Sequence, residues 1–314
     1  MRAPRPPAPP PEPLHPDVAA SRLRVSRRRA LLIGGTVGMG GVLAACASPA
    51  TSTDVTTTSA AATTAGEPPL AAASAVDLLD TASRCETTSE ETQGPYWFDV
   101  DAIRSDIRED RPGAALDLAI RAENITGCAV DGSGAVPIPN AVVEIWHCDA
   151  GGVYSGFEVS SIAANGGRPG GSPAGAAGST GPGSGPGQVS DWSYSVGTRE
   201  GSTTDDGTYL RGAQVTDANG IVTFTTIFPG WYTGRTTHIH LKVHIDRSTA
   251  LTSQLYFPEG TIAEINELAP YTDHPGWQDN TRNDTDGIFD PSGMTTVAHN
   301  GERYLAAINL GIAV

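Results

Sequence analysis

The chain has 314 residues but only one lysine, Lys242, and charged residues make up 18% of it. Its basic residues are few outside the arginine-rich first 45 positions. The remaining sequence holds 13 of the 20 basic and 33 of the 35 acidic residues, a net charge of −20. Such an excess of negative charge repels phosphate backbones and anionic lipid headgroups. The composition therefore argues against nucleic acid and anionic lipid surfaces as partners.

Long apolar runs and long helical periods are scarce as well. One apolar, glycine-rich run extends from Ala30 to Ala45, and it is short for a bilayer-spanning helix, which needs about 20 residues. Outside it, short alternating segments are separated by turns rich in the 37 glycines and 24 prolines. This pattern predicts an all-β fold, a β-sandwich core with long loops and little helix.

The first 46 residues have the order of an export signal. Ser26-Arg-Arg-Arg-Ala-Leu-Leu32 matches a twin-arginine signal, and Leu43-Ala-Ala-Cys46 resembles the lipobox of bacterial lipoproteins. We expect export by the twin-arginine route with Cys46 lipidated. The protein would then be anchored on the outer face of the cytoplasmic membrane through this lipid alone, or secreted. An uncleaved membrane anchor is the alternative, and the proline-rich start leaves the true start codon open.

Composition divides the rest of the chain. Residues 47–82 are rich in Ser, Thr and Ala and predict a flexible linker, with an O-glycosylated stalk as the alternative. Residues 83–314 are predicted to form one domain. Within it, residues 164–190 are Gly- and Pro-rich and predict a disordered insertion, which a fold tolerates because the cost of loop closure grows slowly with length.

Three cysteines remain beyond Cys46, an odd number for an exported protein. One disulfide and one buried thiol are the simplest account. The pair Cys85 and Cys128 is slightly favoured, because Cys148 ends a predicted strand close to the proposed site. The sequence does not decide the pairing.

A turn signature and several alternating segments define the expected elements. Asp217-Ala-Asn-Gly220 lies between two such segments, 208–216 and 220–227, and predicts a hairpin. One modest helix is expected at 262–268. The remaining predicted strands cover residues 116–121, 141–147, 239–245, 253–257 and 305–314.

Polar and apolar residues alternate in the segment that begins at His238, as in a half-buried strand. His238 and His240 therefore point the same way with Cα atoms about 6.6 Å apart, close enough to bind one metal ion. His244 lies roughly 13 Å from His240, too far to share that ion. Tyr232 in a Pro-Gly turn upstream, with Arg235 in between, strengthens this indication of a metal site.

Five motifs in one order resemble the intradiol ring-cleavage dioxygenases, the family of catechol, hydroxyquinol and protocatechuate dioxygenases. Together they extend from about Cys85 to the C-terminus. They are Gln93-Gly-Pro-Tyr96, Asn140-Ala-Val-Val-Glu-Ile-Trp-His-Cys-Asp-Ala-Gly-Gly-Val-Tyr154, Pro229-Gly-Trp-Tyr232, Arg235-Thr-Thr-His-Ile-His240 and Ser253-Gln-Leu-Tyr-Phe257.

The resemblance implies a metal site and a substrate pocket. It assigns the metal ligands to Tyr154, Tyr232, His238 and His240, and one Fe(III) per chain. Two phenolates and two imidazoles also suit Fe(III) chemically, because phenolate is a hard, anionic donor. His147 is expected to play a structural part instead. The catalytic residues would be Arg235, Tyr232 and Gln254, with a plain ion pair as the alternative for Arg235, and the pocket would be lined by Gly94, Pro95, Tyr96 and Trp231.

The implied reaction is cleavage of a catechol-type ring by O2 to a cis,cis-muconate-type diacid, a step of aromatic catabolism in which both oxygen atoms enter the product. Two alternatives stay open, a ferric-iron-binding protein and a degenerate β-sandwich lipoprotein that binds a partner without turnover. The sequence leaves the identity of the catechol and the oligomeric state undecided.

The lipid anchor is testable by substitution. Cys46→Ala should move the protein from the membrane fraction to the soluble fraction, because the lipid is the predicted sole attachment. Cell fractionation followed by immunoblotting measures this, and an unchanged membrane fraction would contradict the lipobox.

Overall fold

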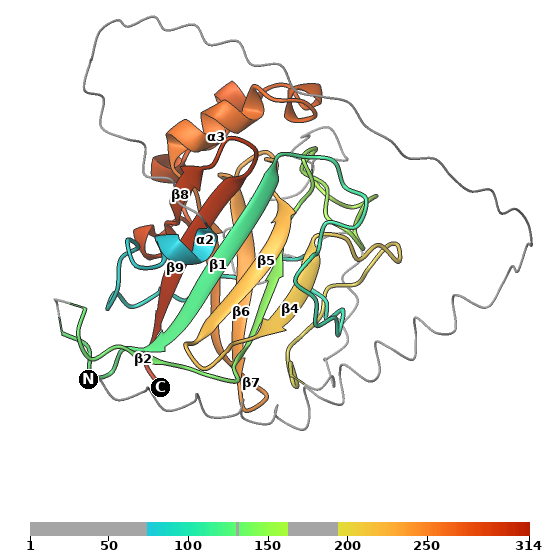
Figure 1. Cartoon of the computed structure of the whole chain (residues 1–314). Helices are drawn as coiled ribbons and strands as arrows, with labels where there is room; N and C mark the ends of the chain where they lie inside the picture. Colours follow the sequence, from blue (N-terminus) through green and yellow to red (C-terminus); the bar gives the residue numbers. More distant parts are fainter. Residues whose placement is uncertain (1–73, 130–131, 163–193) are drawn as a thin grey trace, which may run out of the picture.

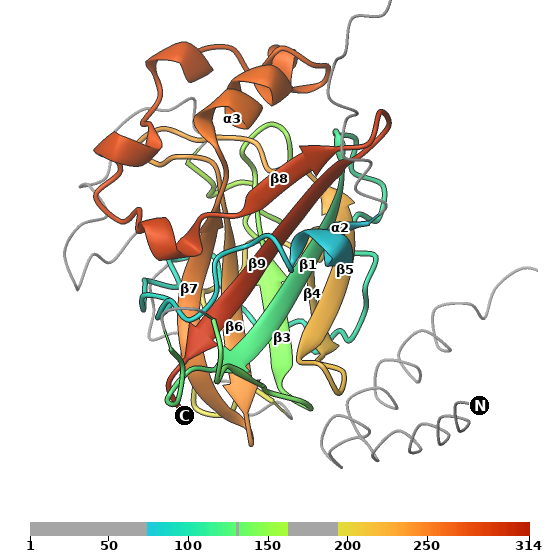
Figure 2. The same ribbon diagram turned by 60° about the vertical axis from the view of Figure 1, so that its left-hand side comes forward.

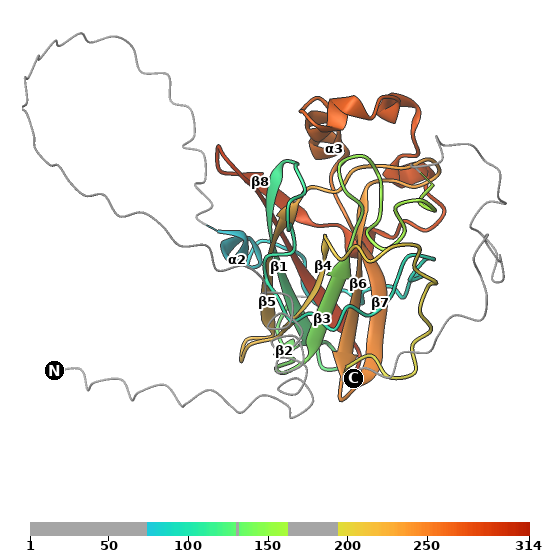
Figure 3. The ribbon, with the colours of Figure 1, turned by 90° about the vertical axis from the view of Figure 1, so that its right-hand side faces the viewer.

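The computed structural model describes residues 74–129, 132–162 and 194–314, which form a five-stranded and a four-stranded β-sheet packed face to face (Figures 1 and 3). In the first sheet β1 pairs with β9 in parallel and with β2 and β5 antiparallel, and β8 completes the edge beside β9. The second sheet is antiparallel in the order β4-β3-β6-β7. The strands are β1 (Ala115–Asn124), β2 (Val136–Pro137), β3 (Val142–Trp146), β4 (Arg211–Val215), β5 (Ile221–Ile227), β6 (His238–Ile245), β7 (Ser248–Tyr256), β8 (Thr296–His299) and β9 (Tyr304–Ile312).

The hydrophobic core lies between the two sheets. Alternate residues of each strand point inward, as the period of two requires. The core side chains with at most 4% exposure include Leu118, Ile120, Phe224 and Ile308 from the first sheet and Val143, Ile145, Leu241 and Val243 from the second.

The outward face of β6 is also buried. His238, His240, Lys242 and His244 are each no more than 3% exposed. The segment Gly94–Trp97 covers part of this face: a side chain at position 94 would touch the His240 ring, and the Lys242 ammonium lies 5.1 Å from the centre of the Trp97 ring. A strand that alternates like a half-buried one is therefore buried on both sides, and its polar face lines an interior site.

The fold class is all-β, as predicted, and the described residues contain two α-helices, α2 (Ala75–Leu78) and α3 (Glu259–Asn266). The predicted strands at 116–121, 141–147, 239–245, 253–257 and 305–314 correspond to β1, β3, β6, β7 and β9. A disulfide joins Cys85 and Cys128, the favoured pair, and Cys148 is a buried free thiol.

The predicted hairpin is wrong. Asp217 does begin a tight turn, since its backbone NH donates to Ile221 O at 3.0 Å and its carbonyl accepts from Gly220 NH at 3.0 Å. The flanking strands, however, belong to different sheets, because β4 pairs with β3 and β5 pairs with β1. A turn signature fixes only the local reversal, whereas the choice of pairing partner depends on distant strands.

The folded part begins earlier than the predicted boundary at residue 83. Helix α2 packs on the outer side of the first sheet, against β1 and β9, and Leu79 just after it is fully buried (Figure 3). Apolar residues at 75, 78 and 79 match the spacing of one helical face, and so short a helix is stabilised by packing rather than by its own propensity. The signal 1–46 and the insertion 164–190 lie outside the described residues.

A helical segment follows β7 and gathers at one end of the sandwich (Figure 2). It consists of α3 and four short 3-10 turns. The segment leads the chain back to β8. The turns are Tyr271–Asp273, Trp277–Asp279, Asn283–Thr285 and Pro291–Gly293. Within the described ranges, no helix has the length and apolar character needed to cross a membrane.

Gly230 offers a test of the packing that positions the Pro-Gly turn. A Cβ there would lie 2.5 Å from the carbonyl oxygens of Asp149 and Ala150, which are backbone atoms and cannot rotate away. Gly230→Ala should lower the free energy of unfolding by about 1–3 kcal/mol. Gly260 in α3 has no atom within 4 Å of its Cβ position, so Gly260→Ala should be neutral or stabilising by about 0.5–1 kcal/mol. Urea unfolding compares the two, and equal effects would contradict this packing.

Candidate metal centre

Strand β6 supplies two imidazoles that face one point. His238 and His240 lie on the same face of the strand, and their Nε2 atoms are 3.1 Å apart. The Nδ1 of His238 is 2.6 Å from the carbonyl oxygen of Thr236. Because that oxygen can only accept, Nδ1 carries the proton and Nε2 presents a lone pair to the site.

Tyr232 reaches the same point from the turn that follows β5. Its hydroxyl oxygen lies 3.2 Å from His238 Nε2. Gly230 NH donates to Asp149 O at 3.1 Å, which ties the turn to the loop after β3. The missing side chain at Gly230 thus permits the close contact between these two loops, each of which carries one of the predicted tyrosine ligands.

Tyr154 closes the site from the loop after β3. It is fully buried, and among the described residues its hydroxyl oxygen makes no hydrogen bond of normal geometry, although, in addition to burial, Tyr232 lies close enough to raise its pKa. Its ring centre lies 5.9 Å from that of Tyr232 and 6.1 Å from that of His240. Buried Arg211 holds the loop by donating to the hydroxyl and carbonyl oxygens of Ser155 at 2.8 and 2.7 Å.

The arrangement fits a single metal ion. Two donors about 2.1 Å from one ion and roughly 95° apart lie about 3.1 Å from each other. The separations of 3.1 Å between the two histidine nitrogens and 3.2 Å between Tyr232 Oη and His238 Nε2 match this value. Within the described residues no group of three or more His, Cys, Asp or Glu is placed to bind a metal.

Burial determines how these groups ionise. It lowers the pKa of His238 and His240 well below the usual range, and Arg235 adds to the shift, so both imidazoles are neutral and able to bind a cation. Burial also raises the pKa of Tyr154 and Tyr232 above that of a free phenol. Only a strongly Lewis-acidic cation would hold both phenols deprotonated near neutral pH, which favours Fe(III) over a divalent ion.

Arg235 lies beside the site, and two nitrogens of its guanidinium are hydrogen-bonded. Its Nε donates to Asp286 at 2.9 Å, and its Nη2 donates to Gln254 Oε1 at 2.6 Å. Burial opposes its charge, but Tyr232 and Asp286 outweigh that effect and raise the pKa of Arg235. The amide of Gln254 donates in turn to Thr92 O at 3.0 Å. Arg235 thus takes part in an ion pair, the alternative stated for it, and is at the same time held next to the predicted ligands.

The segment predicted to line the pocket lies on the ligands themselves. Tyr96 stacks on Tyr154 with ring centres 4.7 Å apart and an angle of 28° between the rings. Gly94 has φ of +68°, and a Cβ there would come within 3.3 Å of the His240 ring. Pro95 between them is exposed. The structure therefore brings Gly94 and Tyr96 to the predicted metal ligands.

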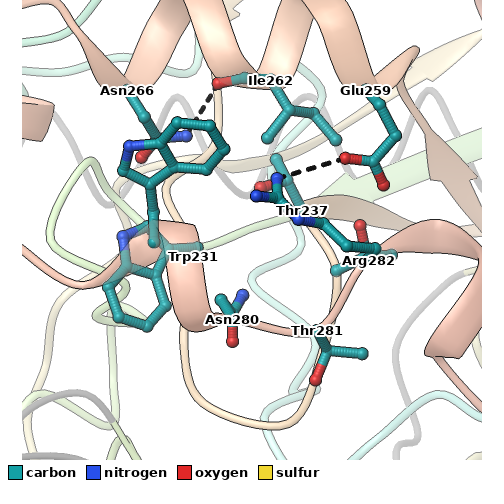
Figure 4. A pocket seen from close by; sticks show the side chains of 10 residues that line it. Trp231, Thr237, Glu259, Ile262, Asn266, Asn280, Thr281 and Arg282 are labelled. Carbon is teal, nitrogen blue, oxygen red and sulfur yellow. Dashed lines mark hydrogen bonds and ion pairs between the residues drawn. The ribbon is translucent and has the colours of Figure 1, made fainter.

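Trp231 faces a separate cavity. Its indole NH donates to His274 O at 3.2 Å, and the ring borders a small cavity (Figure 4). None of the four predicted ligands lines this cavity. Its lining residues are Trp231, Thr236, Thr237, Glu259, Ile262, Asn266, Trp277, Asn280, Thr281 and Arg282.

Two other histidines are structural in this arrangement. His147 is fully buried, with Nδ1 2.8 Å from Cys148 O and Nε2 2.8 Å from the Thr226 hydroxyl, which agrees with the structural part expected for it. His244 lies further along β6, with its Nε2 3.3 Å from a carboxylate oxygen of Glu144.

Comparison with solved structures identifies the fold. An intradiol ring-cleavage dioxygenase from Tetranychus urticae is 29% identical with a TM-score of 0.55, and the match covers 73% of this chain and 95% of that chain. A second solved dioxygenase is 28% identical with a TM-score of 0.57 and the same coverage. The chain has the fold of the intradiol ring-cleavage dioxygenases. No family model matches the chain, and no curated protein does.

The intradiol fold confirms the resemblance predicted from the five motifs. The structure also places near the site residues for which the sequence predicted no role. Trp146 pairs with His240 across β3 and β6, and their rings stack 5.0 Å apart and nearly parallel. Tyr256 is the cross-strand partner of His238 in the pairing of β6 with β7. Strand alternation from Gln254 could have placed Tyr256 on this face, whereas no sequence spacing indicates Asp286.

Metal binding can be tested by comparing substitutions of two histidines on β6, one a predicted ligand and the other a matched control. His240→Ala should weaken metal binding at least about 100-fold, since it removes a ligand. His244→Asn changes a buried histidine of the same strand face that does not reach the site, so its metal content should equal that of the wild type. Elemental analysis after dialysis measures both, with circular dichroism as the check on folding. Equal loss in the two variants would contradict the assigned ligand set.

Proposed function

We propose that the protein is a non-haem Fe(III) intradiol dioxygenase, which cleaves a catechol-type ring with O2 to a cis,cis-muconate-type diacid. The observation that carries the proposal is the convergence of Tyr232 Oη and His240 Nε2 on His238 Nε2, at 3.2 and 3.1 Å, with Tyr154 buried beside them. The two solved dioxygenases with the same fold, one of them an intradiol ring-cleavage enzyme, support it.

The stoichiometry of this reaction needs no external reductant. The bond between the two hydroxyl-bearing carbons breaks, both atoms of O2 enter the product, and the ring electrons reduce the oxygen. Bound Fe(III) would supply the Lewis acidity that keeps phenolic oxygens deprotonated. The protein needs only to hold that ion, to orient the diol, to accept its protons and to stabilise negative charge.

Individual side chains are placed for these tasks. Tyr232 Oη is the phenolic oxygen on the side of Arg235, and as a phenolate it is a base able to accept a proton from the diol. The guanidinium of Arg235 is a fixed positive charge that stabilises negative charge developing on the ring. Gln254 and Asp286 hold that guanidinium from two sides. Tyr96 and Gly94 restrict access on the side of Tyr154 and His240.

The proposed location follows from the sequence alone. We propose that the enzyme is exported in folded form by the twin-arginine route and is anchored through lipidated Cys46 or secreted. A metal inserted before export would then stay in the fold. The substrates would be small aromatic diols and O2 outside the cytoplasmic membrane.

Activity and spectrum test this function together. The purified protein should be burgundy because of charge transfer from tyrosinate to Fe(III), and it should consume oxygen when a catechol is added. Arg235→Gln should keep the metal and lower kcat by about 10²- to 10³-fold, because it removes the charge that stabilises the transition state. An oxygen electrode and a panel of catechols measure this.

Arg303→Gln is the matched control. Arg303 binds Asp117 in the first sheet through two hydrogen bonds of 2.6 Å, so this variant also loses a partnered arginine, but away from the site. Its kcat should stay near that of the wild type. A coloured wild type without oxygen uptake on any catechol would favour the ferric-binding alternative, and a colourless but active wild type would refute the metal assignment.

A further inference from the structure

A chain of hydrogen bonds leads from Arg235 to a carboxyl group outside the proposed mechanism. Arg235 Nη2 donates to Gln254 Oε1 at 2.6 Å, and the Tyr256 hydroxyl lies 3.3 Å from the same oxygen. That hydroxyl is also 2.6 Å from Oε2 of Glu91. Glu91 is itself fixed to β7, since its backbone NH donates to Thr252 O at 2.8 Å.

The surroundings of Glu91 disfavour its charged form. Its other carboxylate oxygen, Oε1, is buried without a hydrogen-bond partner among the described residues. The charged groups around it are Arg235, which favours the carboxylate, and Asp286 and Asp290, which oppose it. Burial outweighs the help from Tyr256 and Arg235 and raises the pKa of Glu91 to about 7. Both protonation states are therefore populated near neutral pH.

The direction of these hydrogen bonds depends on whether the Glu91 carboxyl carries a proton. The Tyr256 hydroxyl has one proton to donate, and a carboxylate at Glu91 takes it, because a bond to a charged acceptor is the stronger one. When Glu91 is protonated, its own OH donates to Tyr256 Oη. The Tyr256 proton is then free to turn to Gln254 Oε1, which has two lone pairs and can accept from both Tyr256 and Arg235.

The two states act differently on the site. A carboxylate at Glu91 partly neutralises the field of Arg235, the charge assigned to stabilise negative charge on the ring. A neutral Glu91 removes this effect, so that only the ion pair with Asp286 opposes the field, and Tyr256 then adds a second donor to Gln254. We propose that Glu91 is a positioning residue that acts on Arg235 through Tyr256 and Gln254, with the uncharged carboxyl as the active form. This role rests on the proposed ring cleavage.

The pH profile of catechol cleavage by the intact metal-loaded enzyme tests the role. In the wild type, kcat/KM should fall as pH rises through about 7, the pKa of Glu91. Glu91→Gln is always neutral, so its kcat/KM should lack this limb, the fall at high pH. The ratio of its kcat/KM to that of the wild type should therefore be about ten times larger one pH unit above the pKa than at acid pH. Tyr256→Phe should shrink the limb as well, because the carboxyl then has no hydroxyl to reorient.

Glu264→Gln is the matched control. Glu264 accepts a hydrogen bond of 2.7 Å from the Tyr304 hydroxyl, the same carboxyl–tyrosine pair placed between α3 and β9. This variant should keep the limb of the wild type. A limb that persists at full size in Glu91→Gln or in Tyr256→Phe would overturn the inference and leave the proposed function standing.

A measurement without turnover separates the two proposals. Infrared difference spectra of the metal-free protein should show a protonated-carboxyl signal that titrates near pH 7 and loses the contribution of one carboxyl in Glu91→Gln, while that of Glu144 remains. Titration of Glu91 in the ordinary range, at about 4.3, would overturn the inference whatever the activity. Absence of turnover on every catechol would overturn the proposed function, and this inference with it.

Discussion

The candidate site depends on the burial of a polar strand face. β6 turns His238, His240, Lys242 and His244 outward from the core, yet each is at least 97% buried. Burial of polar groups is costly unless each group is paired. The polar groups at the two ends of this face meet this requirement in different ways. Toward the start of β6 the imidazoles are neutral and converge with two phenols, an arrangement that a bound cation would satisfy. Further along, the groups must satisfy one another.

The second half of the face is a buried charge cluster around Glu144, which lies beside Lys242 across β3 and β6. Glu144 accepts hydrogen bonds from the Trp97 indole at 3.1 Å, and its other neighbour His244 lies 3.3 Å away. Burial raises the pKa of Glu144 to about 7, against the opposing effects of Trp97 and Lys242. The only lysine of the chain therefore serves in the interior. The cluster also fixes Trp97, and through the backbone it fixes Tyr96 on Tyr154.

Much of this arrangement could be predicted from local sequence. The alternation from His238 placed two imidazoles on one face, and the structure places His244, which was expected to lie too far along the strand, beside Glu144. The order of the motifs predicted the intradiol fold. What failed depended on long-range pairing: the turn at Asp217 was correct, but it joins two sheets instead of two paired strands. Similarly, Asp286 binds Arg235 from a 3-10 segment some 50 residues away, and no periodicity connects such positions.

The fold brings two carboxyl groups to Arg235 in different ways, Asp286 directly and Glu91 through Tyr256 and Gln254. Asp286 binds a guanidinium and a backbone NH, so both of its oxygens have donors. Among the described residues, Glu91 has one side-chain donor, Tyr256, and its Oε1 is buried without a partner. Burial is the largest effect on the pKa of Glu91 and of Glu144, and the donors that reach these two carboxyl groups offset it only in part. Arg235 therefore has a direct ion pair with Asp286 on one side and, on the other, a carboxyl group that is populated in two protonation states near neutral pH.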